Sequence, residues 1–291
     1  PDHHLLLTDF HHAISDGFSL SVFVRELLQH YQGEALVPVS QQYGDYLKWE
    51  QQYRQSARYQ QDAAYWQQQQ LQQRPPTELP LCHSRPARQS FCGGRLFSVL
   101  DAPLTAALKQ AARQHQVSLF MLLLAGCQLW LSRLCRQTEV QVGVPAVVRG
   151  NEAAEHTMGM YTNTLVLAQD IDEQQTLAEL LQQVRSRCVG AYQHQAFPFE
   201  DLLSHGSGPL QTNARNPLFD VMFVYENAED RVLDLPGLQV RDLPFDPGVS
   251  SFDLCLELIE QQGQVRLNLH YATALFASDI LQHWLDALFA L

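Results

Sequence analysis

Positive charge is scarce in this sequence of 291 residues, which has 19 Lys and Arg against 31 Asp and Glu and a formal net charge of −12. Proteins that bind nucleic acid by its phosphates concentrate basic residues on one surface. The basic residues here are few and scattered along the chain. The composition therefore argues against nucleic acid as a partner.

Long apolar runs, a signal peptide and paired cysteines are lacking too. The nearest candidate for a membrane span, residues 119–131, is too short and ends in Ser132 and Arg133, which indicates a buried helix instead. No CxxC pair occurs, so free thiols are expected rather than a disulfide framework or a zinc site. The cysteines are Cys82, Cys92, Cys127, Cys135, Cys188 and Cys255. We expect no membrane, no bound metal and a cytoplasmic location.

Helix and strand patterns alternate along the chain. Apolar residues make up 46% of it and charged residues 17%, which is enough for a sizeable core. Helical periodicity covers residues 19–31, 103–115, 118–133, 176–192 and 278–291, and a glutamine-rich helix or helix pair covers 41–73. Strand patterns cover 4–10, 95–100, 140–144, 164–168 and 221–225, with a hairpin of 254–260 and 264–271 around Gln262-Gly263. This mixture predicts an α/β fold.

Residues 11–17, with the sequence HHAISDG, place an imidazole and a carboxylate four residues apart on a turn between the predicted strand 4–10 and the predicted helix 19–31. Apolar residues recur on one face of that helix and Gly33 follows it as a stop signal. The first backbone amides of the helix, Gly17 among them, are donors that can stabilise negative charge on a carbonyl oxygen. The pattern is the outline of an acyl-transfer site.

The HHAISDG segment resembles the HHxxxDG signature of condensation domains of non-ribosomal peptide synthetases, which have the chloramphenicol-acetyltransferase-like fold. Five further segments resemble motifs of that family in the family's order: YGDYLKW at 43–49, GVPAVVR at 143–149, MGMYTNT at 158–164, HQAFPFE at 194–200 and RNPLF at 215–219. The resemblance runs over all 291 residues. Since the family has a segment before the double histidine and Pro1 is not a methionine, the chain is expected to be a fragment that lacks most of the N-terminal lobe.

The resemblance implies a two-lobed pseudo-dimer with the active site in a tunnel between the lobes. Residues 1–85 would be the C-terminal part of the N-terminal lobe together with a proline-rich connector. Residues 86–291 would be the C-terminal lobe, in which 145–163 resembles the floor loop of the tunnel and 226–251 resembles a crossover that latches onto the first lobe.

The implied reaction is aminolysis of a donor acyl or peptidyl thioester by the amine of an acceptor aminoacyl thioester, which forms an amide bond. An α-amine has a pKa of about 8, so a neutral imidazole can take or share its proton. The resemblance assigns this role to His12 and gives Gly17 a place beside the carbonyl and the pantetheine arm. It implies that His11, Asp16, Arg149 and Asn163 support the site. In this interpretation Asp16 belongs to a structural ion pair, and Arg149 is the candidate for its partner.

The implied partners are donor and acceptor peptidyl carrier protein domains and an adjacent adenylation domain, and the substrates would arrive on 4′-phosphopantetheine with no cofactor bound by the domain itself. Acidic carriers favour local basic spots around Arg54, Arg58, Arg185 and Arg187. An epimerisation domain and a catalytically silent recruitment domain remain alternatives. A heterocyclisation domain and a coenzyme A-dependent acyltransferase fit the motifs less well.

Overall fold

The computed structural model describes residues 3–150, 152–204, 214–228, 235–241, 243 and 245–291. The chain forms two compact units. The first unit comprises Pro1–Tyr59, Val147–Asn163 and Asp230–Asp242, and the second comprises Gln60–Ala146, Thr164–Glu229 and Leu243–Leu291. The division falls inside three elements, α3 (Ala57–Gln68), β2 (Glu139–Val147) and β3 (Thr162–Asp170). The lobe boundary expected near residue 85 stays a prediction.

The first unit is built on two helices, α1 (Gly17–Tyr31) and α2 (Tyr43–Arg54), and a short 3-10 helix, η2 (Glu152–His156). Asp16 caps α1, where its side chain accepts from the backbone N–H of Ser19. The glutamine-rich stretch is a helix pair, α2 followed by α3, because the helix is interrupted at Gln55 and Ser56. The sequence predicted a helix over 19–31 and a helix or helix pair over 41–73, and the structure confirms both predictions.

The prediction of a buried strand over residues 4–10 is wrong. No described residue from 3 to 10 belongs to a strand, and the leucines of the segment are exposed, with Leu5 at 72%, Leu6 at 62% and Leu7 at 74%. A strand needs a neighbour to pair its backbone N–H and C=O groups, and none of the described residues pairs with this segment. An apolar run without a partner strand stays irregular.

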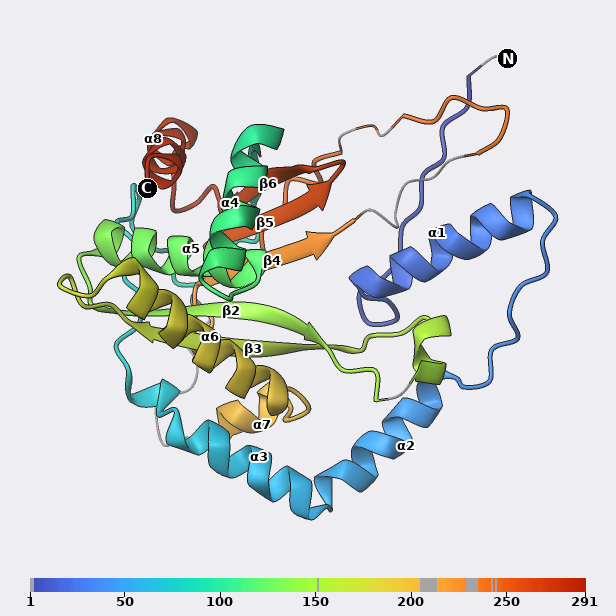
Figure 1. Cartoon of the computed structure of the whole chain (residues 1–291), viewed down its shortest axis with the longest axis horizontal. Helices are drawn as coiled ribbons and strands as arrows, with labels where there is room; N and C mark the ends of the chain where they lie inside the picture. The colour runs from blue at the N-terminus through green and yellow to red at the C-terminus, as the bar shows by residue number, and fades with distance from the viewer. Residues whose placement is uncertain (1–2, 151, 205–213, 229–234, 242, 244) are drawn as a thin grey trace. The chain divides into compact units, whose positions relative to one another are not determined.

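The second unit contains a six-stranded sheet with the order β1-β6-β5-β4-β2-β3 (Figure 1). Its further strands are β1 (Gly93–Leu100), β4 (Val221–Asn227), β5 (Leu254–Gln261) and β6 (Gln264–Ala272). β6 pairs antiparallel with both β1 and β5, whereas β4 runs parallel to β5 and to β2. The mixed α/β class predicted from the sequence is confirmed.

The hairpin between β5 and β6 turns at Gln262 and Gly263, whose φ angles are 51° and 74°. Two successive residues with positive φ match the right-handed twist of the strands on either side. Glycine adopts this conformation at little cost, so the Gln-Gly pair fixes the register of the two strands. The sequence predicted this hairpin at this position.

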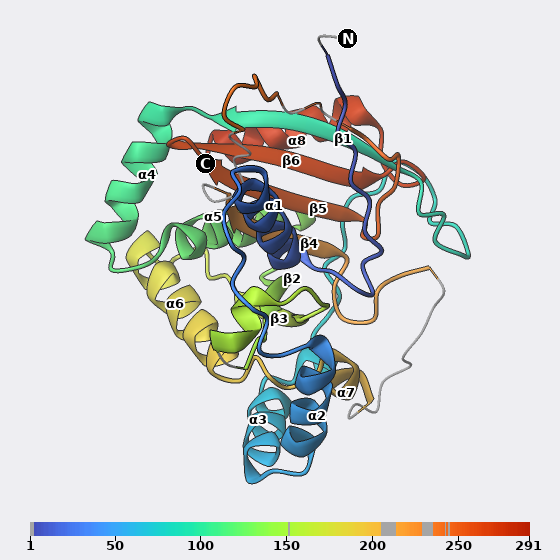
Figure 2. The same cartoon turned by 90° about the vertical axis from the view of Figure 1, so that its right-hand side faces the viewer.

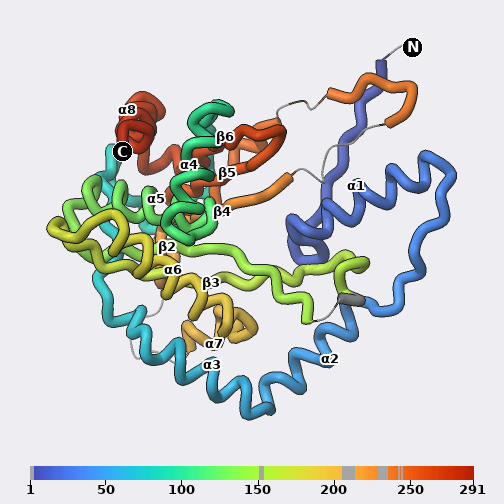
Figure 3. Tube along the Cα trace, in the orientation of Figure 1, coloured from blue at the N-terminus to red at the C-terminus, as the bar shows by residue number. Residues whose placement is uncertain are grey.

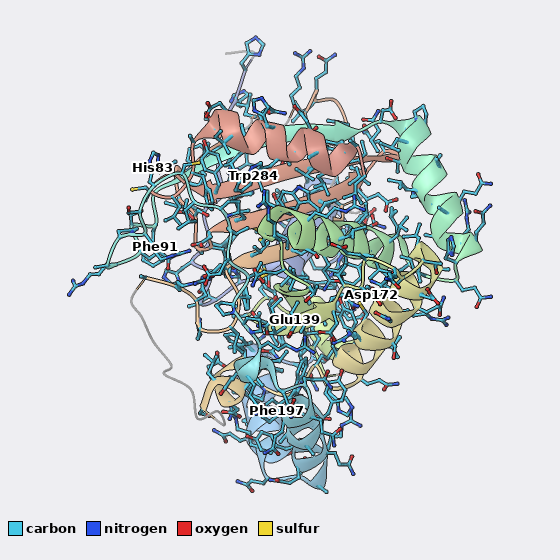
Figure 4. The ribbon with its side chains drawn as sticks, turned by 90° about the vertical axis from the view of Figure 1, so that its left-hand side faces the viewer. His83, Phe91, Glu139, Asp172, Phe197 and Trp284 are labelled. Atoms are coloured by element: carbon cyan, nitrogen blue, oxygen red, sulfur yellow. The ribbon has the colours of Figure 1, made fainter. Side chains whose placement is uncertain are left out.

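Helices cover one face of the sheet (Figure 2). They include α4 (Ala102–Gln114), α5 (Leu119–Cys135), α6 (Leu177–Gln193) and α8 (Ser278–Phe289), while α7 (Phe199–Ser204) and η1 (Leu71–Gln73) are short. Figure 4 looks onto this helical layer, with Trp284 of α8 labelled. Leu254, Leu256, Leu267 and Leu269 of β5 and β6 are at most 2% exposed and form the core under the helices.

Among the described residues, no single helix is long and apolar enough to cross a membrane. Only α4 and α5 together meet that length and composition, and they are bent by 99° at the break between them.

Ion pairs fix the irregular connector between η1 and β1. Arg74 lies 2.5 Å from Asp170 and 3.2 Å from Glu139, and Arg85 donates to both carboxylate oxygens of Asp253. Asp253 is 3% exposed, so its charge is compensated inside the protein by Arg85. The part of the predicted crossover 226–251 that the structure describes contains the end of β4, and Val249 forms an isolated bridge to Cys92. Residues 229–234, 242 and 244 of it lie outside the described residues.

Gly93 is expected to be intolerant of any side chain. Its backbone N–H donates to the carbonyl of Gly248 at 2.8 Å, and a Cβ at Gly93 would lie 2.6 Å from the backbone nitrogen of Ser250. Because backbone atoms held by a bridge move little, we expect Gly93→Ala to lower the free energy of unfolding by about 1–3 kcal/mol. Denaturant unfolding measures the change.

The same substitution at Gly126, inside α5, is the control, because nothing lies within 4 Å of a Cβ there. Alanine restricts the unfolded chain and favours the helix, so Gly126→Ala should raise the stability by about 0.5–1 kcal/mol. Equal effects of the two substitutions would contradict the steric argument.

Candidate active site

The double-histidine turn orients His12 through one hydrogen bond. Nδ1 of His12 lies 2.7 Å from the backbone carbonyl oxygen of Ser15, and the turn is closed by the N–H of Ile14, which donates to the carbonyl of His11 at 3.0 Å. A carbonyl oxygen only accepts, so the ring proton resides on Nδ1 of His12. In the neutral imidazole the lone pair is then on Nε2. His12 is exposed.

Asp16 lies under this turn with its carboxylate buried and fully bonded. Its Oδ1 accepts from the backbone N–H and the hydroxyl of Ser19, at 2.8 and 2.7 Å, and its Oδ2 accepts from the N–H of Tyr161 at 3.1 Å and from the hydroxyl of Thr162 at 3.4 Å. Its side chain is 0% exposed. In the described part of the chain no hydrogen bond joins Asp16 to His12, so Asp16 holds the helix end rather than the imidazole.

Arg149 is the ionic partner of Asp16. Its Nη2 lies 3.3 Å from Oδ1 of Asp16, and its Nη1 donates to the backbone carbonyls of Thr157, at 2.7 Å, and of Ala154. The guanidinium lies 4.1 Å from the ring centre of Phe18 and 4.3 Å from that of Tyr161, within range of a cation–π interaction. Burial lowers the pKa of Arg149, and the negative charge of Asp16, which raises it, offsets only part of that effect. The guanidinium thereby ties the 147–163 segment to the cap of α1.

The other predicted site residues lie close along the chain or at the ends of this segment. Gly17 is the first residue of α1, directly after Asp16. His11 precedes His12, is exposed, and accepts from the N–H of Ala13 at 3.1 Å through Nδ1. Asn163 is half-buried near the start of β3, next to Thr162. The structure therefore brings Asp16 and Arg149 into contact, and it links His12 to them only through the turn that Asp16 ends.

Ser19 is a member of the buried network around Asp16 that the sequence analysis missed. It is 0% exposed, and its hydroxyl oxygen lies 2.7 Å from Oδ1 of Asp16 and 2.9 Å from the carbonyl oxygen of Gly159, two acceptors that share its one proton. The same oxygen accepts from the N–H of Gly159 at 3.0 Å. The Asp-x-x-Ser spacing is a capping-box pattern, and it could have predicted the contact between Ser19 and Asp16. Nothing local in the sequence indicates the contact with Gly159.

An aromatic row along α2 supports the same segment. Tyr43, Tyr46, Trp49 and Tyr53 follow one another at helical spacing with ring centres 5.4–5.6 Å apart, and the hydroxyl of Tyr43 donates to the carbonyl of Met160 at 2.9 Å. Tyr161 lies edge-on to Tyr43 and Tyr46, at 5.1 and 4.9 Å. Burial raises the pKa of Tyr46, so its hydroxyl stays neutral. Figure 3 follows the chain from β2 through this segment into β3.

A family model described as a condensation domain matches residues 1–291. The chain belongs to the condensation domain family of non-ribosomal peptide synthetases. This condensation domain chain is 36% identical over 281 residues to surfactin synthase subunit 1 of Bacillus subtilis (strain 168), a match that covers 97% of this chain and 8% of that relative. It is 34% identical over 288 residues to bacitracin synthase 1 of Bacillus licheniformis, which covers 99% of this chain and 6% of that relative. The chain therefore spans less than a tenth of the length of these relatives.

Solved structures share the fold of this condensation domain chain. The X-domain from teicoplanin biosynthesis matches with a TM-score of 0.82 and 24% identity, over 96% of this chain and 66% of that one. The condensation domain from the Monacolin K polyketide synthase matches with a TM-score of 0.82 and 20% identity, over 97% of this chain and 67% of that one. The chloramphenicol-acetyltransferase-like fold expected from the motifs is confirmed.

Proposed function

We propose that the protein carrying this chain forms an amide bond between a donor acyl or peptidyl thioester and an acceptor aminoacyl thioester. The observation that carries the proposal is the orientation of His12, whose Nδ1–H is held by the carbonyl of Ser15 so that Nε2 is the basic nitrogen. The membership of the condensation domain family supports the reaction class. The relatives named as surfactin synthase subunit 1 and bacitracin synthase 1 support a biosynthetic reaction.

In the proposed reaction the nitrogen of the acceptor amine attacks the carbonyl carbon of the donor thioester. A tetrahedral intermediate forms, the C–S bond then breaks, and the thiolate of the donor pantetheine leaves. Nε2 of His12 accepts the proton that the amine loses and returns it to the thiolate. Each step conserves protons, and the thioester is activated enough that no metal or bound cofactor is needed in the scheme.

The remaining site residues have supporting roles in this proposal. Gly17 keeps the approach to the carbonyl free of a side chain, and His11 closes the turn that presents His12. Asp16 and Arg149 hold the turn and the 147–163 segment together by their ion pair. Asn163, beside Thr162 at the start of β3, would fix the end of that segment.

The proposed partners are donor and acceptor carrier protein domains that present their substrates on 4′-phosphopantetheine, and an adenylation domain in the same polypeptide. Of the four arginines expected to favour acidic carriers, Arg54 bonds Glu50 at 3.0 Å and Arg187 bonds Asp170 at 2.5 Å. Arg58 and Arg185 are exposed. Carrier docking is proposed to involve these basic positions.

Intact-protein mass spectrometry tests the reaction. The complete parent protein is mixed with a donor-loaded and an acceptor-loaded carrier protein, and the mass of each carrier is followed. Transfer of the donor mass to the acceptor carrier is expected. An unchanged carrier mass together with an inverted stereocentre, read by chiral analysis of the amino acid released from the carrier, would indicate an epimerase instead.

A recruitment domain is the second candidate, because a relative in fold, the teicoplanin X-domain, has been solved in a complex with OxyB. Neither transfer nor inversion with any carrier pair, together with binding of a second protein, would favour this candidate. The complete His-His-x-x-x-Asp-Gly motif supports catalysis over recruitment.

A further inference from the structure

One peptide group joins His12 to the buried network under its turn. The carbonyl of Ser15, which lies 2.7 Å from Nδ1 of His12, and the N–H of Asp16 belong to the same peptide group. That N–H donates to the hydroxyl oxygen of Ser19 at 3.3 Å. Because a peptide group is planar and trans, its C=O and N–H point in opposite directions and rotate together. The His12 ring and the Ser19 hydroxyl therefore hold the two ends of one rigid group.

The Ser19 hydroxyl uses its full hydrogen-bonding capacity. Its oxygen accepts from two backbone N–H groups, that of Asp16 and, at 3.0 Å, that of Gly159. Its one proton is shared between Oδ1 of Asp16 and the carbonyl oxygen of Gly159. A hydroxyl offers one donor and two acceptor sites, so all of them are occupied. Since Ser19 is 0% exposed, solvent does not compete for these bonds.

Gly159 has little freedom to move, so its two main-chain bonds fix the place of the hydroxyl oxygen. A Cβ on this glycine would lie 2.8 Å from Cε2 of Tyr161 and still closer to the ring of Tyr43. The hydroxyl of Tyr43 also holds the next carbonyl, that of Met160, at 2.9 Å. Close packing of this kind resists displacement. The position of the Ser19 oxygen is therefore set by tertiary contacts as well as by α1.

We propose that Ser19 is a positioning residue for His12. Its hydroxyl holds the N–H of Asp16, and the carbonyl of Ser15 in the same peptide group holds Nδ1–H of the imidazole; we call these two bonds the Ser19 relay. A neutral imidazole carries its proton on either nitrogen, and only the Nδ1–H form has a basic Nε2. Without a fixed carbonyl partner the ring exchanges between both forms, and the Nε2–H form cannot accept a proton there. The inference rests on the proposed function, in which Nε2 accepts the proton of the amine.

The pH dependence of acyl transfer tests the Ser19 relay. Ser19→Ala removes the hydroxyl with little change in volume, and we expect the single-turnover rate of the parent protein to fall by about tenfold to a hundredfold at neutral pH, the effect of a misplaced reacting group. The deficit should shrink as the pH rises above about 8, because the amine then loses its proton without help from His12. A deficit that stays constant over this pH range would indicate a purely structural effect and overturn the proposal.

A double-mutant cycle separates positioning from folding. Ser19→Ala is introduced into the wild-type protein and into His12→Ala, and the transfer rates are compared. If Ser19 acts through His12, its removal costs little further rate once His12 is gone, whereas independent effects multiply. An equal loss from Ser19→Ala in both backgrounds would contradict the relay.

Tyr43→Phe is the matched control for Ser19→Ala. It removes one bond to the same segment, the one to the carbonyl of Met160, but none to the peptide group between Ser15 and Asp16. Whatever rate it loses should be lost by the same factor in the His12→Ala background and at every pH. A pH-dependent deficit equal to that of Ser19→Ala would mean that the segment as a whole, and not the Ser19 relay, positions His12.

The protonation form of the His12 ring tests the relay without catalysis. The parent protein is labelled with ¹⁵N-histidine, and the His12→Ala variant identifies the signals of His12. At a pH at which the ring is neutral, protonated and unprotonated ring nitrogens have different chemical shifts. We expect a protonated Nδ1 and an unprotonated Nε2 in the wild type and in Tyr43→Phe, and a mixture of both forms in Ser19→Ala. An Nδ1–H form that persists unchanged in Ser19→Ala would overturn the proposal.

The two readouts separate this inference from the proposed function. A wild-type protein that transfers no acyl group with any loaded carrier pair, but whose His12 ring changes form in Ser19→Ala, contradicts the proposed reaction and keeps the relay. Transfer at the wild-type rate in Ser19→Ala, together with an unchanged ring, keeps the reaction and removes the relay.

Discussion

Replacing His12 by alanine is expected to lower the rate of acyl transfer by about 10²–10⁴-fold, the range that a positioned acid–base group contributes. The substitution removes Nε2, the nitrogen left basic when Nδ1 donates to the carbonyl of Ser15. The amine of the acceptor then has no protein group in the scheme to take its proton. Single-turnover transfer between loaded carriers, followed by intact-protein mass spectrometry, measures the rate.

Two further measurements make the interpretation specific. His30→Ala removes an exposed imidazole from the last turn of α1, and its rate should match the wild type. A higher pH increases the fraction of neutral amine, so His12→Ala should regain part of its lost rate as the pH rises above about 8. A His12→Ala rate equal to that of wild type at neutral pH would exclude His12 as the proton acceptor.

Replacing Asp16 by alanine is expected to lower the free energy of unfolding of the first unit by about 3–5 kcal/mol, the usual cost of removing one partner from a buried ion pair. Arg149 would remain with 7% of its side chain exposed and without its carboxylate. The N–H of Ser19, the N–H of Tyr161 and the hydroxyl of Thr162 would lose their acceptor as well. Denaturant unfolding monitored by tryptophan fluorescence reports the loss.

Asp45→Ala is the matched control for this substitution. Asp45 also serves the N-terminus of a helix, accepting from the N–H of Gln42 at 3.0 Å, but its side chain is 44% exposed and its ionic partner is the exposed Lys48. Exposed pairs contribute about 0–1 kcal/mol, so the change should be several times smaller than for Asp16→Ala. Comparable losses in the two variants would mean that the buried network is not what stabilises the cap of α1.

Local patterns in the sequence were enough to predict most elements. The 3.6-residue periodicity and Gly33 indicated α1, Thr176 is the N-cap that begins α6, and Gln262-Gly263 turns the β5–β6 hairpin. These signals are local because they depend on backbone hydrogen bonds and turns within a few residues. The helix α7 was not predicted because six residues are too few to show a period.

The contacts of the candidate site are not local, and the sequence could not show them. Asp16 and Arg149 are separated by 133 residues, and Ser19 and Gly159 by 140. The motifs containing these residues were recognisable one by one, but their meeting depends on tertiary packing. The prediction of a strand over 4–10 was wrong because it used only a local signal, the apolar composition of the segment. Strand formation also requires a partner strand.

The bonds from Ser19, Arg149, Tyr161 and Thr162 to one carboxylate, that of Asp16, have a consequence for protein engineering. The segments 11–31 and 147–163 form one structural unit that should be exchanged as a whole, although more than a hundred residues separate them in the chain. A chimaera that takes these two stretches from different synthetases replaces one half of a matched set, whereas one that exchanges both together keeps the set. Crossover points for recombining condensation domains should therefore be chosen in pairs.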